Sequence, residues 1–280
     1  MGLRNKRLVL TTINTTLLLA LGFLVLAPFL FMLIGSLTPT RHIFAYGLSL
    51  RLPETISLEN YRALWTNRDG IYWQFFLNSV YITSVTTCAV LVFTSMTGYG
   101  LAQYTFRGRN VLIIILLCTM MVPGTILLLP LFRMLTAMGL MDTYYGVILP
   151  VMVPSFAVFF FRQFCVGLPR DFAEAARIDG AGETRIFTQI YVPMMSPAYG
   201  AMAILTGMGV WNDFLWPMVV LRTTTKFTIA PGLMMSITPY ENSFDVLFAG
   251  SVMAVLPIVI LFLLNQRAFI DGLTVGGVKG

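Results

Sequence analysis

The feature that most constrains this chain is a series of long segments that contain no charged residue. The first lies between Arg7 and Arg41 and is almost continuously apolar, with Pro28 near its centre. About 20 predominantly apolar residues are enough to cross the hydrocarbon core of a membrane as a helix. Of the 280 residues, 57% are hydrophobic and 11% charged, whereas soluble domains average about 25% charged residues. The chain is therefore predicted to be an integral membrane protein rather than a soluble or disordered one.

Six such segments are long enough to span a membrane, and they predict an all-α polytopic fold with six transmembrane helices. Strands of a β-barrel would alternate apolar and polar residues over about 10 positions, and runs such as Ile260–Leu264 do not alternate. The fifth segment has a polar centre at Asn212 and Asp213. The segments lie between Arg7 and Arg41, Asp69 and Arg107, Arg109 and Arg133, Asp142 and Arg162, Arg185 and Asp213, and Asp245 and Arg267, and the fifth resumes at Phe214–Leu221.

The basic residues indicate how the chain is oriented. Arg4, Lys6 and Arg7 precede the first span, which favours a cytoplasmic N-terminus. This start also resembles a secretory signal, but the apolar run exceeds a signal core and no A-x-A site follows. With six spans the C-terminus is also cytoplasmic, and the long loops 38–70 and 222–245 are external. Because the net charge of +6 is then explained by the membrane, no nucleic-acid partner is expected.

Several kinds of chemistry find no support in the sequence. Cys88, Cys118 and Cys165 form no C-x-x-C pair, and His42 is the single histidine, so no metal site and no catalytic residue are predicted. There is no Gly-Lys dipeptide, and a phosphate-binding loop needs one. We therefore expect no cofactor in this chain, and an integral-membrane enzyme is the least favoured class.

The most informative stretch is 162–185, where 24 residues carry eight charges between two apolar segments. Asp171 followed by Glu174 predicts a helix start, as an acidic variant of the capping box. Gly180 predicts the stop, since glycine accepts the left-handed conformation beyond a helix end. A short helix over Phe172–Asp179 with alanines on its surface is suited to another protein's groove. A solvated amphipathic loop is the alternative.

Candidate substrate contacts gather in and near the fifth segment. Asn212 and Asp213 interrupt it between Trp211 and Trp216, and Asn78 is polar within the second segment. Acidic residues inside membranes usually face a bundle interior or cavity, and aromatic faces beside amide and carboxylate groups suit sugars. The alternatives are tryptophans at the membrane interface and hydrogen bonds between helices.

The stretch EAARIDGAGETRIFTQIYVP, Glu174–Pro193, resembles the EAA signature of binding-protein-dependent ABC importer permeases. Val192 stands where that signature usually has leucine. The residues that match are Glu174, Ala175, Ala176, Gly180, Ile190 and Pro193. The chain is also similar to the carbohydrate-uptake subfamily, and most of all to the shorter second permease subunit of maltose-type systems, in the stretches NYRALW (Asn60–Trp65), LNS (Leu77–Ser79), GYGLAQYTFRGR (Gly98–Arg109), WNDFLWP (Trp211–Pro217) and GLTVGGVKG (Gly272–Gly280).

The resemblance implies the type I importer permease fold and a set of partners. These are a second permease subunit, two ATPase subunits that bind ATP and Mg, an extracytoplasmic solute-binding protein, and the bilayer of a bacterial or archaeal cell (inner) membrane. It implies that a helix of the 162–185 loop docks in an ATPase subunit and that the tail, with Gly277 and Lys279, reaches towards the ATPase pair. A frayed terminus is the alternative for the tail. The coupling residues would be Asp171, Glu174, Ala175, Ala176, Arg177, Asp179 and Gly180.

The expected organisation has three parts: residues 1–70, the first helix and an external loop; residues 71–271, the permease domain with the coupling loop 162–185; and residues 272–280, the tail. The expected function is half of the translocation pathway of an ATP-driven sugar or oligosaccharide importer. Import of a glycerol-phosphate-type solute by the same machinery is one alternative. A stand-alone secondary transporter or channel is another, although many such transporters consist of two related halves and no internal repeat is visible.

Overall fold

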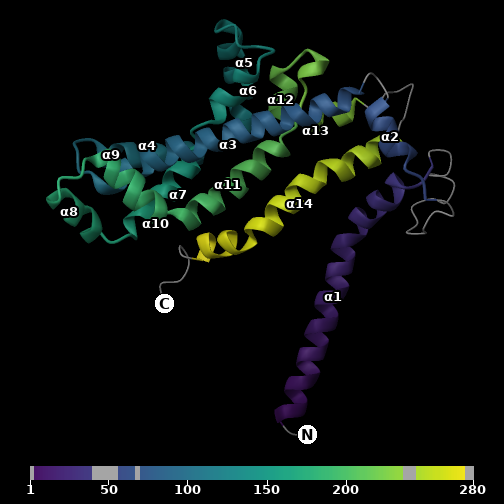
Figure 1. Ribbon diagram of the computed structural model, residues 1–280, viewed down its shortest axis with the longest axis horizontal. Helices are drawn as coiled ribbons and strands as arrows, with labels where there is room; N and C mark the ends of the chain where they lie inside the picture. Colours follow the sequence, from purple (N-terminus) through teal and green to yellow (C-terminus); the bar gives the residue numbers. More distant parts are fainter. Residues whose placement is uncertain (1–2, 40–55, 67–69, 236–243, 275–280) are drawn as a thin grey trace. The chain divides into compact units, whose positions relative to one another are not determined.

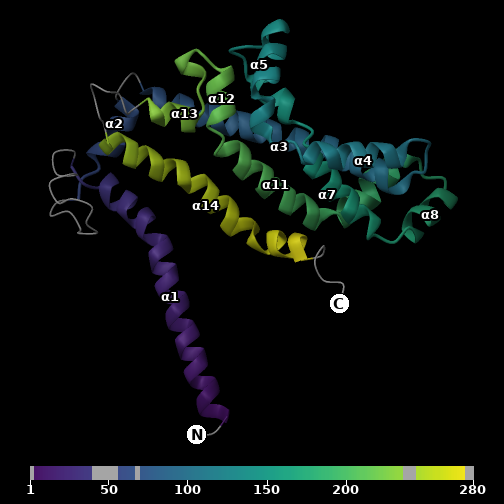
Figure 2. The same cartoon turned by 180° about the vertical axis from the view of Figure 1, so that it is seen from behind.

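A computed structural model describes residues 3–39, 56–66, 70–235 and 244–274. These residues form helices joined by turns, with no strand among them, which agrees with the all-α prediction (Figures 1 and 2). The chain divides into two compact units. One comprises residues 1–73 and 233–256, and the other comprises residues 74–232 and 257–280.

In the first unit, one turn near Ser36 is fixed by a buried amide. Asn60 donates from Nδ2 to the carbonyl oxygens of Ser36 and Thr38 at 3.0 and 2.9 Å, which satisfies carbonyls that a helix end leaves open. The Tyr72 hydroxyl donates to the carbonyl of Gly250 at 2.8 Å. The unit consists of α1 (Leu3–Ser36), α2 (Glu59–Thr66), the start of α3 (Ile71–Gln103), the end of α13 (Ile229–Met234) and the first part of α14 (Phe244–Thr274).

The second unit holds most of α3 and the helices that follow it. Within this unit α8 and α9 lie at one end of α3, and α12 lies near its other half (Figures 1 and 2). Its further elements are α4 (Arg109–Met120), a 3-10 turn (Gly124–Leu127), α5 (Leu128–Ala137), α6 (Tyr144–Ile148), a 3-10 turn (Leu149–Val151), α7 (Ser155–Val166), α8 (Asp171–Ile178), α9 (Glu183–Ile186), a π-helical turn (Phe187–Tyr191), α10 (Val192–Met194), α11 (Ser196–Trp211), α12 (Leu215–Val220) and a 3-10 turn (Thr224–Lys226).

The core of the second unit lies where α3 and α7 cross. A Cβ built on Gly98 would come within 2.7 Å of the Arg162 backbone nitrogen and 2.8 Å of the Phe161 Cβ, so only glycine permits this approach. Beyond the crossing, the Arg109 Nε donates to the Leu101 carbonyl at 2.8 Å, a basic cap on the end of α3. The buried core cluster combines residues of α3 and α7 with residues of α8 and of the chain after it. Its members are Val90, Tyr99, Ala102, Ala157, Phe161, Cys165, Ala173, Ile186, Tyr191, Met195, Ala198 and Met202.

The prediction of six spans is met only in part. Three described helical segments are long and apolar enough to cross a membrane, namely Leu10–Ser36, Ile71–Gln103 and Val246–Leu263. Two bent pairs raise the number to five, with bends of 93° between Arg109–Met120 and Gly124–Ala137, and 43° between Tyr144–Val151 and Ser155–Val166.

The predicted fifth span is broken instead of continuous. Its main helix, α11, has 16 residues, which at 1.5 Å per residue is about 24 Å, short of a core of about 30 Å. It begins at Ser196, with Pro197 in its first turn, and it ends at Trp211 with Asn212 as the capping residue. The next helix, α12, begins at Leu215. Proline at one end and a polar pair at the other shorten the helix that the apolar run alone predicted.

Candidate functional site

The short helix predicted within 162–185 is present as α8, and its end is a complete Schellman motif. Gly180 has φ +81°, the Gly180 N–H donates to the Arg177 carbonyl at 3.0 Å, and the Ala181 N–H donates to the Ala176 carbonyl at 2.9 Å. This is the 5→2 and 6→1 pair of the motif, which requires a left-handed residue after the cap. A Cβ on Gly180 would meet nothing within 4 Å. The requirement for glycine is therefore conformational and not steric.

The start of α8 differs from the prediction. Arg170 is the residue that caps the helix, and no side chain makes a capping hydrogen bond there. The expected acidic capping box is therefore wrong in its hydrogen bonding. Asp171 and Glu174 both fall in the first turn, where a carboxylate is favoured by the helix dipole without any direct bond to the backbone.

One face of α8 is anchored and the rest is exposed. Ala173 is 2% exposed and belongs to the core of the second unit, whereas Phe172 is 57% and Ile178 87% exposed. The remaining residues predicted for coupling, Asp171, Glu174, Ala175, Arg177, Asp179 and Gly180, are exposed, and Ala176 is half-buried against the core. The small residues thus permit close approach to the molecule's own core, while the large apolar ones point away from it.

A carboxylate missed by the sequence analysis holds this loop to α3. Glu183, at the start of α9, accepts from Arg177 Nε at 2.7 Å and Nη2 at 3.2 Å. The hydroxyls of Tyr104 and Tyr99 donate to the same carboxylate. Arg177 and then Tyr104 hold the pKa of Glu183 down to about 2. Glu183 therefore joins α8, α9 and the end of α3 in one polar cluster.

The predicted substrate-path residues are dispersed within the second unit. Asn78 donates from Nδ2 to the carbonyls of Thr225 and Phe227 at 2.8 and 3.0 Å, and it accepts from the Tyr144 hydroxyl at 2.8 Å. Its amide donors and its carbonyl are thus engaged in holding the segment after α12. This arrangement is the interhelical hydrogen bonding that was the alternative to solute contact.

The residues after α11 serve local structure in the same way. Asn212 Nδ2 donates to the Met208 carbonyl at 2.9 Å. The Trp216 N–H donates to Asp213 Oδ1 at 3.2 Å, and the Trp216 indole Nε1 donates to the Val147 carbonyl at 3.2 Å. These three predicted contacts therefore cap and pack helices.

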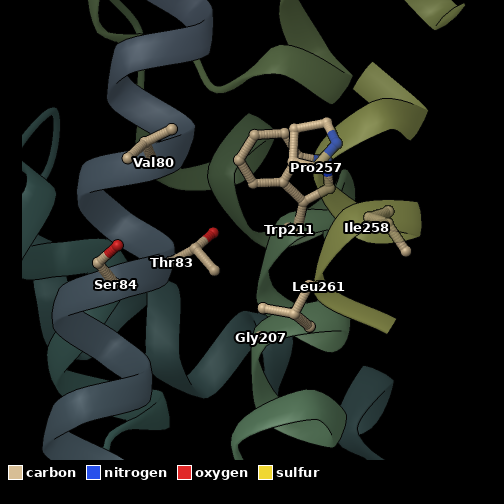
Figure 3. Close-up of a pocket in the computed structure, with 8 residues that line it drawn as sticks. All are labelled: Val80, Thr83, Ser84, Gly207, Trp211, Pro257, Ile258 and Leu261. Carbon is tan, nitrogen blue, oxygen red and sulfur yellow. The ribbon is translucent and has the colours of Figure 1, made fainter. Parts of the chain in front are cut away.

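Trp211 is placed differently, because it lines a cavity between α3, α11 and the second half of α14 (Figure 3). The cavity has a volume of about 160 Å³. Trp211 is 7% exposed, and its ring meets Phe76 edge-on with centroids 5.7 Å apart. Of the five predicted substrate-path residues, it is the one that borders this cavity.

A second carboxylate cluster lies in the turn between α5 and α6. The Arg222 and Thr223 N–H groups donate to Asp142 Oδ1 at 2.9 and 3.0 Å, and the Lys226 ammonium lies 3.0 Å from Oδ2. Asp142 has φ +57°, and these hydrogen bonds, with that from Thr223 first, hold its pKa well below the usual range. The turn is thereby fastened to the segment that follows α12.

Gly277 and Lys279 of the predicted tail, and the loop residue His42, lie outside the described residues.

Comparisons with known proteins agree with the family resemblance and with the helical fold. The sequence model of the family "Binding-protein-dependent transport system inner membrane component" matches residues 91–274. The chain belongs to this family. It is 47% identical over 95% of both chains to the arabinooligosaccharides transport system permease protein AraQ of Bacillus subtilis. It is 32% identical over 92% of both chains to the lactose transport system permease protein LacG of Rhizobium radiobacter.

A solved structure shows the same fold. The chain resembles one from a bacterial ABC transporter involved in the import of the acidic polysaccharide alginate, with a TM-score of 0.86 and 23% identity. The match covers 96% of this chain and 99% of that chain. The protein is thus an inner-membrane permease component with the fold of an ABC importer permease.

Proposed function

We propose that this chain forms half of the translocation pathway of an ATP-driven oligosaccharide importer and that α8 couples it to an ATPase subunit. The names of AraQ and LacG, at 47% and 32% identity, support an oligosaccharide as the solute. Because the more similar of the two transports arabino-oligosaccharides by its name, short arabinose oligomers are the first solutes to test.

The observation that carries the coupling proposal is the exposure of Phe172 and Ile178 on an otherwise charged loop. Exposing a large apolar side chain to water forgoes about 1.5–3 kcal/mol relative to burial. Two such residues on a helix of eight residues suit insertion into a partner's groove. The anchored face with Ala173 leaves these two side chains directed outward.

The Glu183 cluster gives a route by which movement of α8 reaches the membrane helices. Arg177 of α8 and Tyr104 beyond the end of α3 bind the same carboxylate. A displacement of α8 by a closing ATPase subunit would pull on Tyr104 through Glu183 and press on the α7 core through Ala173. Coupling would thus use a polar connection to α3 and an apolar contact with α7.

Partner subunits would supply the remaining parts of the transporter. ATP and Mg would be bound by the two ATPase subunits, and an extracytoplasmic solute-binding protein would deliver the sugar to this chain and the second permease subunit. The loop 162–185 and both termini would face the cytoplasm, and residues 272–280 would extend towards the ATPase pair.

The test replaces the left-handed residue of the α8 turn. A side chain at positive φ costs about 1–2 kcal/mol, and a β-branched one also redirects the exit into α9. Gly180→Val should therefore keep normal membrane abundance, lose co-purification of the ATPase subunits, and lower ATP-driven uptake by at least tenfold. Gly182→Val is the matched control, because Gly182 has φ −71° and a Cβ there meets nothing within 4 Å.

Glu174→Ala should be milder than Gly180→Val, since it removes one charge of the first turn without redirecting the chain. Retained docking and uptake in Gly180→Val would reduce the loop to a solvated connector and overturn the coupling proposal. Uptake of glycerol phosphate in place of oligosaccharides would overturn the solute class. Ion-driven uptake by the purified chain without any ATPase would overturn the importer assignment itself.

A further inference from the structure

The cavity beside Trp211 combines one aromatic ring with helix hydroxyls. It is open on one side and mostly apolar. Figure 3 shows the Thr83 side chain extending from α3 towards the side where Trp211 and Pro257 lie. Its lining includes Thr83 and Ser84 of α3, Gly207 and Trp211 of α11, and Pro257 and Leu261 of α14.

The threonine hydroxyls of α3 fall into two groups. Thr94 and Thr97 donate to the carbonyl four residues earlier, at 2.6 and 2.7 Å, as helix threonines commonly do. The Oγ1 atoms of Thr83, Thr86 and Thr87 are buried and have no hydrogen-bond partner within the described part of the chain. A buried hydroxyl without a partner costs about 1–3 kcal/mol. This stretch of α3 therefore favours an occupant that can exchange hydrogen bonds.

Gly207 of α11, which has no side chain, leaves space for a ligand opposite these threonines. Thr83 and Thr87 are one turn apart on α3 and share a face, and a Cβ built on Gly207 would lie 3.8 Å from Thr87 Oγ1. Trp211 follows Gly207 by one turn of α11. An apolar wall with a few placed hydroxyls is the usual composition of a small-molecule site. A sugar ring has an apolar C–H face for the indole and hydroxyls for threonine.

We infer that the cavity between α3, α11 and α14 is a subsite for one sugar ring of the transported oligosaccharide, with Trp211 against the ring face and Thr83 hydrogen-bonded to a sugar hydroxyl. The inference rests on the proposed function and adds the position in this chain where the solute is held. A lipid acyl chain would fill the apolar part but would leave the Thr83 hydroxyl unpaired. A sugar satisfies both parts.

The experiment uses the assembled transporter, with its ATPases and a saturating amount of solute-binding protein, in proteoliposomes. Arabinotriose is the probe, and the quantity measured is sugar imported per ATP hydrolysed. Thr83→Val removes the hydroxyl at nearly constant volume and should lower this ratio about threefold to tenfold, the loss of one hydrogen bond. Thr83→Ser should restore it, and Trp211→Leu should lower it further.

Thr97→Val is the matched control, because its hydroxyl is exposed on the same helix and bonds to the Phe93 carbonyl. Equal ratios in Thr83→Val and Thr97→Val, with normal wild-type import, overturn the subsite and leave the proposed function standing. A parallel fall of ATPase stimulation in Thr83→Val overturns it as well, because the defect then lies in assembly. A wild-type transporter that imports no oligosaccharide overturns both proposals.

Discussion

Two carboxylates of the second unit each join segments that are far apart in the sequence, and they do so with different donors. Glu183 receives side-chain donors, from Arg177, Tyr104 and Tyr99. Asp142 receives two backbone N–H groups together with Thr223 and Lys226, and its own N–H donates to the Val220 carbonyl at 2.9 Å. Each cluster includes a residue with positive φ close by: Gly180 comes three residues before Glu183, and Asp142 itself has positive φ.

The difference indicates which of the two connections can be released more easily. Rotatable side chains can release and re-form a contact, and a half-exposed ion pair such as Arg177–Glu183 contributes only about 0–1 kcal/mol. Backbone donors are fixed by the fold around them. The α8–α9 loop is therefore held by an adjustable connection, whereas the α5–α6 turn is held as a fixed support.

The largest effect is expected from Glu183→Gln. The charge-assisted bonds from Arg177 weaken while the fold of each helix remains, so we expect uptake to fall about fivefold to tenfold at unchanged membrane abundance. Tyr104→Phe should give a smaller loss, and the double variant should show less than the sum of the two effects, because both act through one cluster. Uptake and immunoblotting of membranes measure this, with exposed Tyr145→Phe as the control. Fully additive losses would contradict a shared cluster.

Asp142→Ala should act on stability more than on coupling. It removes the acceptor of the Arg222 and Thr223 N–H groups and places alanine at positive φ, which together should cost about 1–3 kcal/mol. Asp142→Asn keeps an acceptor oxygen and tolerates the left-handed conformation, so its loss should be smaller. The measurement is the melting temperature of the detergent-solubilised protein beside uptake. A loss of uptake as large as that of Glu183→Gln, without a fall in melting temperature, would remove the distinction between the two carboxylates.

The smallest effect expected is a pH dependence. The pKa of Glu183 is lowered from 4.5 to about 2 by Arg177 first and Tyr104 next. A carboxyl with a depressed folded pKa stabilises the fold above its unfolded pKa and loses this contribution as the pH falls towards the folded value. The difference in melting temperature between wild type and Glu183→Gln should therefore shrink as the pH falls below about 4.5 towards 2. Because the group is half-exposed, the change should stay below about 1 kcal/mol. A difference that is constant with pH would contradict the ion pair.

The sequence predicts those features that depend on neighbouring residues. The end of α8 at Gly180, with its positive φ, follows from one glycine after an alanine-rich helix. The α8 start is less well predicted, because Asp171 and Glu174 favour the first turn electrostatically and make no capping bond. Apolar runs likewise locate the membrane segments, but their length does not reveal the break of α11 at Asn212.

The features that sequence reasoning misses are contacts between distant residues. Tyr104 and Glu183 are 79 positions apart, and Asp142 and Lys226 are 84 apart, with no local pattern linking either pair. The same limit applies to the cavity between α3, α11 and α14. Trp211, Asn212 and Asp213 are adjacent in sequence, yet of these three only Trp211 borders the cavity, and Asn212 and Asp213 hydrogen-bond to Met208 and Trp216.

The exposed Phe172 and Ile178 also bear on how cells make this protein. If α8 docks into a partner as proposed, a newly inserted copy presents these two large apolar side chains to water until the partner covers them. Such a copy would be prone to self-association and to capture by chaperones or proteases. A surplus of this subunit over its partners would then be removed by degradation, which would keep the components of the assembly in proportion.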